Sequence, residues 1–130
     1  AAAGILPGHL VAEALGKVEV HGTAATNAQK LFAQKNIATA GDLDQAYADG
    51  ETVSYGAYHS GQSVSALVAA NAAAILDGAA LESAGDGTLR TVSADAATDQ
   101  TQRDSIVAYA QVALDNSANA AVARISVRIA

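Results

Sequence analysis

The sequence contains no cysteine, methionine or tryptophan and a single proline among its 130 residues. The lack of cysteine excludes disulfide bonds, thiolate metal sites and cysteine nucleophiles. The aromatic residues are four tyrosines and one phenylalanine. They lack the interleaved basic residues that base stacking on single-stranded nucleic acid requires. These absences remove several common classes of catalytic and nucleic-acid-binding site.

Positive charge is also scarce in the chain. Seven lysine and arginine residues face thirteen acidic residues, which gives a formal net charge of −6 and a pI near 4.7. The cations are scattered, whereas a surface that binds phosphates needs a basic patch. We therefore expect no nucleic-acid partner.

Long apolar runs are absent as well. The longest, Ala66–Leu76, is interrupted by Asn71 and reaches about half the length of a membrane span. No charged segment precedes an apolar one in the way typical of a secretory signal peptide. We expect no membrane partner and no signal peptide in this sequence.

Hydrophobic residues make up 51% of the chain, but about half of them are alanine, which buries little area. A chain of this length fits one domain with a modest core. We expect a thinly cored domain that gains stability from contacts with neighbouring subunits.

Short runs of alternating apolar and polar residues, separated by turn residues, predict an all-β fold. Two hairpins are expected. One is formed by Thr52–Tyr58 and Val64–Val68, and the other is formed by Ile106–Leu114 and Ala123–Ile129. In the final strand, Ile125 and the apolar residues at every second position share a face that we expect to complete the core. The predicted strands are Leu10–Ala14, Val18–His21, Thr52–Tyr58, Val64–Val68, Ala80–Ser83, Leu89–Val92, Ile106–Leu114 and Ala123–Ile129.

Segments with weaker patterns leave alternatives open. Asn27–Ala38 fits a helix or a turn followed by a strand, and the alternation that begins at Leu31 favours the strand. Leu43–Ala48 is the expected position of one short helical turn, and the alanine-rich Ala69–Ala74 could form a second. Ser93–Arg103 is polar and predicts a surface loop.

The first eight residues are small or aliphatic and end in a Pro7–Gly8 turn. We predict an N-terminal arm over residues 1–8 and a single β-rich domain over residues 9–130. Such an arm could lie as an added strand along a neighbouring subunit. The candidate contact residues are Ala1, Ala2, Ala3, Gly4, Ile5 and Leu6.

No set of residues has the spacing of a catalytic or metal site. The acidic segment Asp42–Glu51 does not match an EF-hand loop, which needs an oxygen ligand and a glycine where Ala46 and Tyr47 stand. The three histidines are far apart, and the segment around Ser60 lacks the first glycine of a GxSxG nucleophile elbow. We therefore expect no enzymatic activity, no metal and no cofactor.

Three segments of the chain resemble the head decoration proteins of tailed bacteriophages. Residues 6–33 contain LPGHLV and QKLFA, residues 46–89 contain GETV, SGQSVSALV and LESAGDGTL, and residues 106–130 contain LDNS and ARISVRI. No single motif is specific, so the order and spacing of all of them carry the resemblance. The sequence departs from the family pattern at Ser60, where a proline is usual, and in the long alanine run after Ala69.

The resemblance implies a small barrel-like or sandwich-like (β-tulip-like) domain that binds the outer surface of a phage capsid, commonly as trimers at local threefold axes. It implies the major capsid protein as partner and a homotrimer on the capsid. It also implies a location on the virion surface after synthesis in the host cytoplasm, with no catalytic residues and no cofactor. We therefore expect a structural protein that cements the capsid lattice.

Two other classes of structural protein fit the same sequence features. One is a different virion component, such as the base of a head fibre or a tail protein. The other is a cell-surface β module, such as a pilin-like or adhesin subunit. Co-purification with intact heads, in about the copy number of the capsid protein, would distinguish decoration from both.

Overall fold

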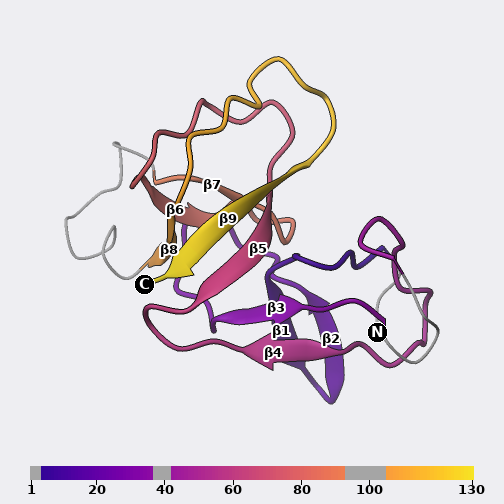
Figure 1. Cartoon of the computed structure of the whole chain (residues 1–130). Coiled ribbons are helices and arrows are strands. Elements are labelled where there is room, and N and C mark those ends of the chain that lie inside the picture. The colour runs from indigo at the N-terminus through magenta and orange to yellow at the C-terminus, as the bar shows by residue number, and fades with distance from the viewer. Residues whose placement is uncertain (1–3, 37–41, 93–104) are drawn as a thin grey trace.

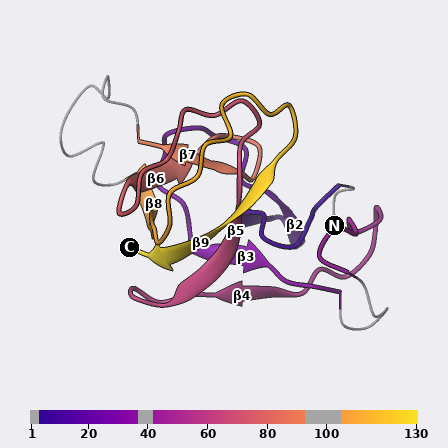
Figure 2. The ribbon, with the colours of Figure 1, turned by 45° about the horizontal axis from the view of Figure 1, so that its top comes forward.

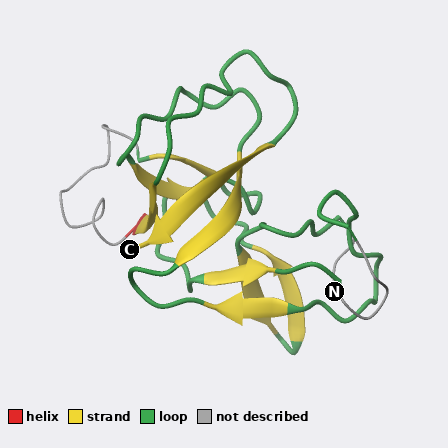
Figure 3. Cartoon of the chain, in the orientation of Figure 1, coloured by secondary structure: helices red, strands yellow, loops and turns green. Residues whose placement is uncertain are grey.

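The computed structural model describes residues 4–36, 42–92 and 105–130. The part of the chain so described is nearly all-β, as the sequence predicts, with helix only at Ser105 (Figures 1 and 3). Its strands are β1 (Val11–Ala14), β2 (Lys17–Val20), β3 (Leu31–Ala33), β4 (Tyr55–Ala57), β5 (Ser63–Val68), β6 (Ala80–Ser83), β7 (Leu89–Thr91), β8 (Ile106–Ala110) and β9 (Ala123–Ile129).

Five of these strands close into a barrel in the order β5-β7-β6-β8-β9. The β5–β9 ladder is antiparallel and runs from the pair Ser63–Arg128 to the pair Val68–Ala123. The other contacts are also antiparallel, except that β5 and β7 pair in parallel through Val68 and Leu89. Closure leaves the barrel without an open sheet edge.

The remaining strands form two antiparallel pairs, β1–β2 and β3–β4. These pairs lie next to each other on one flank of the barrel (Figures 1 and 2). An isolated bridge between Leu10 and Phe32 joins the start of β1 to β3. The molecule therefore has a barrel and a layer of small sheets, which we call the small-sheet layer (β1–β4 with residues 4–9).

Each part has its own core. In β9 the side chains of Ile125, Val127 and Ile129 are buried in the barrel, while Ser126 and Arg128 are exposed. This alternation confirms the prediction that the final strand completes the core. The small-sheet layer holds a second, smaller core, whose buried members are Ile5, Val11, Leu31, Ala33, Tyr47 and Val53.

Of the two predicted hairpins, the one between Ile106–Leu114 and Ala123–Ile129 is confirmed by the pairing of β8 with β9. The structure also pairs β1 with β2 and β6 with β7. The predicted hairpin between Thr52–Tyr58 and Val64–Val68 is wrong. Its first strand is shorter and pairs with β3 through Phe32 and Gly56, and its second pairs with β9. The physical reason is that period-2 alternation specifies which face of a strand is buried but not which strand lies beside it.

The predicted helical segments are also wrong. Leu43–Ala48 contains a turn followed by extended chain, because the Tyr47 amide donates to the carbonyl of Ile5 at 2.8 Å instead of to a helical turn of its own. Ala69–Ala74 has no helical residue, and the amide of Asn71 donates to the carbonyl of Asn119 at 2.8 Å. Pairing with distant segments has overridden a weak local preference for helix.

The described part of the predicted arm is built into the small-sheet layer. Ile5 is 0% exposed, the Gly4 amide donates to the carbonyl of Tyr47, and the Gly8 amide donates to the carbonyl of Ala33. The domain boundary at residue 8 therefore moves, since residues 4–8 are part of the fold. Ala1–Ala3 and Ser93–Arg103 lie outside the described residues.

Candidate functional site

The acidic residues around position 45 serve as local hydrogen-bond acceptors. Asp42 Oδ1 accepts from the amide of Leu43 at 3.0 Å. Glu51 accepts from the amide of Ala48 and from the side chain of Asn36, both at 2.8 Å. Among the described residues, no three His, Cys, Asp or Glu side chains come close enough together to hold a metal ion. These contacts give the segment a structural role.

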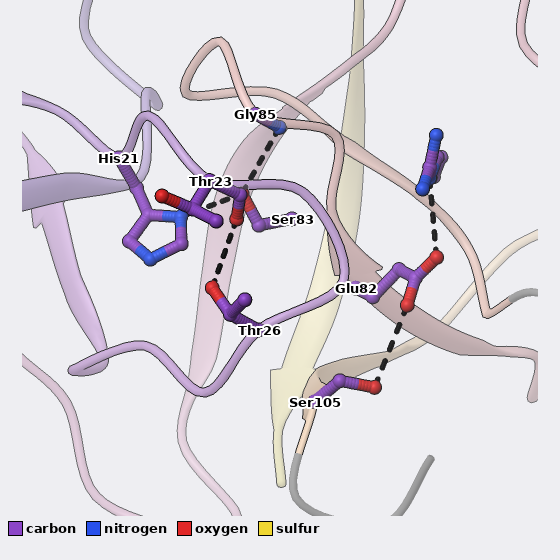
Figure 4. Close-up of polar contacts among 8 residues, drawn as sticks. His21, Thr23, Thr26, Glu82, Ser83, Gly85 and Ser105 are labelled. Carbon is purple, nitrogen blue, oxygen red and sulfur yellow. Dashed lines mark hydrogen bonds and ion pairs between the residues drawn. The ribbon is translucent and has the colours of Figure 1, made fainter. Parts of the chain in front are cut away.

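A serine and a histidine distant in sequence come together where the small-sheet layer meets the barrel. His21 Nδ1 lies 2.7 Å from Ser83 Oγ on β6 (Figure 4). The amide of Gly85 also donates to this oxygen, at 3.2 Å, and Ser83 is fully buried. A buried hydroxyl that already accepts a hydrogen bond cannot meet a substrate, so the pair is a structural contact rather than a nucleophile and its base.

The neighbouring residue Glu82 is a charged group inside the barrel wall. It is 1% exposed, and its carboxylate accepts from Arg90 Nε at 3.1 Å and from Ser105 Oγ at 3.4 Å (Figure 4). A buried carboxylate needs such partners because removing it from water is costly. Sequence reasoning missed both this pair and the His21–Ser83 contact, since neither has a local sequence motif.

The two-residue loop of the β1–β2 hairpin has an unusual residue for its backbone conformation. Ala14 pairs with Lys17, so the loop consists of Leu15 and Gly16, with φ angles of 51° and 75°. Two positive φ angles in a two-residue loop are typical of a type I′ turn, where asparagine and glycine are preferred. Leucine in this conformation costs about 1–2 kcal/mol, and the side chain of Leu15 is 102% exposed.

The loops at one end of the barrel form an extended surface with little charge (top of Figure 1). We call residues 70–78 and 111–122 the loop surface; its charged residues are Asp77 and Asp115. Leu76, Val112 and Val122 are exposed on it. Its two halves are joined by the bridge between Ile75 and Leu114. The buried Asn116 ties the second half to Ala69, just before the first, because its amide nitrogen donates to the carbonyls of Ala69 and Ala121 at 2.9 and 3.0 Å.

A groove of about 700 Å³ lies between the barrel and the small-sheet layer. Two of its lining residues are cations, Lys35 and Arg124. The Arg124 guanidinium donates to the backbone carbonyls of Pro7 and Leu43, which holds the N-terminal segment against β9. The other lining residues are Pro7, Gly8, Phe32, Ala33, Gln34, Leu43, Tyr58, Val64 and Ser65.

The sequence-predicted contact residues are not gathered on one exposed surface. Ile5 is buried in the second core and Leu6 is half-buried, while Gly4 is exposed. Ala1–Ala3 lie outside the described residues. The exposed apolar side chains at Leu15 and on the loop surface had no sequence signal beyond an ordinary Leu–Gly turn and an alanine-rich composition.

Comparison with known proteins adds no relative. No protein-family model matches the chain, and no curated protein matches it. No helix in the described residues is long and apolar enough to cross a membrane. The features that bear on function are therefore the resemblance in sequence and the surface features described above.

Proposed function

We propose that this protein is a structural component of a tailed-phage virion that attaches to the outer surface of the capsid and stabilises the lattice of the major capsid protein. The proposal starts from the resemblance of residues 6–33, 46–89 and 106–130 to head decoration proteins. The protein would act by contact alone, as a trimer on the capsid, without chemistry and without a cofactor.

The observation that carries the proposal is Leu15. The side chain of a fully exposed leucine gains no stability from burial, and a leucine with φ 51° is unfavourable in the backbone. Asparagine, which is preferred at this turn position, would relieve the backbone. Strained residues that persist in a fold are concentrated at functional sites. A residue that strains the backbone and gains no burial in the isolated fold is best explained by a contact that Leu15 makes in an assembly.

The loop surface supports the same proposal. It presents the exposed side chains of Leu76, Val112 and Val122, and only two of its own residues are charged. A surface with few charged groups costs less to desolvate on association than a highly charged one. Attachment through such surfaces should depend weakly on salt, because screening acts on charges.

The experiment compares binding and stability in Leu15→Asn. Undecorated expanded heads are mixed with the wild-type protein or the variant, and bound protein and the disruption temperature of the heads are measured. We expect the isolated variant to be more stable by up to about 1 kcal/mol, because the turn is relieved. We expect it to bind heads more weakly than the wild type does.

Ala25→Gly is the matched control, because Ala25 also has a positive φ, 56°, but lies away from the hairpin tip. It should gain stability in the same way and bind heads like the wild type. If the wild-type protein neither binds heads nor raises their disruption temperature, the proposed function is wrong. If it binds and Leu15→Asn binds equally well, the contact is made elsewhere.

A further inference from the structure

Two of the three histidines lie at the junction between the small-sheet layer and the barrel. His9 is 7% exposed and His21 is partly buried, whereas His59 lies exposed in a turn. Both junction histidines flank the turn between β6 and β7. The Leu10 amide donates to the carbonyl of Gly87 at 2.8 Å, and the Gly87 amide donates to the carbonyl of His21 at 3.1 Å.

The small-sheet layer and the barrel approach each other closely at Gly87. Its φ is 82°, and a Cβ atom there would lie 3.2 Å from Cδ2 of His9 and 2.9 Å from Cβ of Val20. There is thus little free space beside the His9 ring on the side of the turn. Water cannot readily enter there to solvate a charged imidazolium.

His9 is bonded in a way that requires its neutral form. The backbone amide of Leu6 donates to Nδ1 of His9 at 3.0 Å. An amide is only a donor, so Nδ1 must carry no proton, and the neutral ring has its proton on Nε2. Protonation of Nδ1 would set two N–H groups against each other and release the Leu6 amide.

His21 is held by a comparable contact. Ser83 Oγ accepts from the amide of Gly85 and lies 2.7 Å from His21 Nδ1, so a Ser83 hydroxyl proton directed at Nδ1 satisfies all three groups (Figure 4). In the imidazolium, Nδ1 becomes a donor. The Ser83 hydroxyl proton would then need another acceptor inside the buried junction.

The surroundings of both rings favour the neutral form. Burial lowers the pKa of His9; Asp86 on the β6–β7 turn opposes this effect, and Arg124 on β9 adds to it. Burial also lowers the pKa of His21, opposed by a hydrogen bond with the backbone of Asn27. In the described part of the chain, no charged side chain contributes to the shift in the pKa of His21.

We propose that His9 and His21 make the contact between the small-sheet layer and the barrel sensitive to pH, so that acidification loosens the N-terminal segment from the barrel. The direction in which stability changes with pH follows from the linkage between proton binding and folding. A histidine with a lowered pKa in the folded state contributes stability that is complete above the ordinary pKa of about 6.5 and is lost as pH falls through the folded-state pKa. This inference does not depend on the proposed function.

The experiment measures urea unfolding and amide hydrogen exchange at pH 7.5 and pH 5.5 in the wild type, in His9→Asn with His21→Asn, and in His59→Asn. Asparagine keeps an acceptor oxygen near the Nδ1 position but does not titrate. In the wild type we expect a lower urea midpoint at pH 5.5 and a fall in the protection factor of the Leu6 amide. Both changes should disappear in the double variant and persist in His59→Asn.

A titration of the imidazole resonances of the wild-type protein by NMR provides a measurement that requires no variant to fold. We expect the two junction histidines to titrate below about 6.5. The proposal is wrong if they titrate at or above that value, if the Leu6 protection factor is equal at the two pH values, or if the double variant keeps the acid dependence of the wild type.

Discussion

The guanidinium of Arg124 on β9 donates a hydrogen bond of 2.7 Å to the backbone carbonyl of Pro7, which lies 117 residues earlier in the chain. A second nitrogen of the same group donates to the carbonyl of Leu43. One side chain of the barrel therefore fixes the N-terminal segment and the segment around Leu43. The bond to Pro7 is partly buried and the bond to Leu43 is exposed. A hydrogen bond from a charged donor contributes more than a neutral pair does.

Arg124→Ala should lower the free energy of unfolding by about 1.5–3 kcal/mol, because it removes charge-assisted hydrogen bonds to two backbone carbonyls. Arg128→Ala is the matched control, since Arg128 is exposed on the same strand; a change within about 0.5 kcal/mol is expected there. Chemical denaturation of both variants measures the difference. Equal effects would contradict a special role for Arg124.

Ile5→Ala tests whether the N-terminal segment belongs to the fold. Ile5 is 0% exposed in the second core, so the substitution should cost about 2–4 kcal/mol. Leu6→Ala, at a half-buried position, should cost less. Deletion of residues 1–6 should destabilise the isolated domain at least as much as Ile5→Ala. A deleted protein that unfolds like the wild type would restore the interpretation of a free arm.

Ile125→Ala tests the core face of the final strand. The side chain is 3% exposed in the barrel, and its truncation should cost about 2–5 kcal/mol. Leu76→Ala removes a similar number of atoms from a side chain that is 71% exposed and should have little effect on stability. Thermal unfolding of the two variants provides the comparison, and a loss confined to Leu76→Ala would place β9 outside the core.

Arg90→Ala leaves the buried carboxylate of Glu82 without its cationic partner. We expect a loss of about 1–3 kcal/mol, below the range for fully buried pairs, because the Arg90 side chain is 41% exposed and water can partly replace it. Replacing both residues by leucine should recover much of the stability. A double variant no more stable than Arg90→Ala would show that the pair itself is not the source of the loss.

The strand content of this protein was determined largely by its sequence. Alternation in Ala123–Ile129 correctly predicts which side chains of β9 are buried, because the period of a strand is a local property of the backbone. The strands Ala80–Ser83 and Leu89–Val92 were likewise predicted from their pattern, and the turn between them contains Gly85 and Gly87, which accept a positive φ. The net charge and the lack of cysteine likewise limit the possible chemistry without reference to a fold.

Only the tertiary structure decided which strands pair and which polar groups meet. Thr52–Tyr58 alternates well, yet β4 pairs with β3 rather than with β5, because alternation does not encode a partner. The contacts of His9 with Leu6, of His21 with Ser83 and of Arg124 with Pro7 have no motif. They arise because barrel closure brings distant segments together, and a buried polar group must then bond to whatever partner lies within reach.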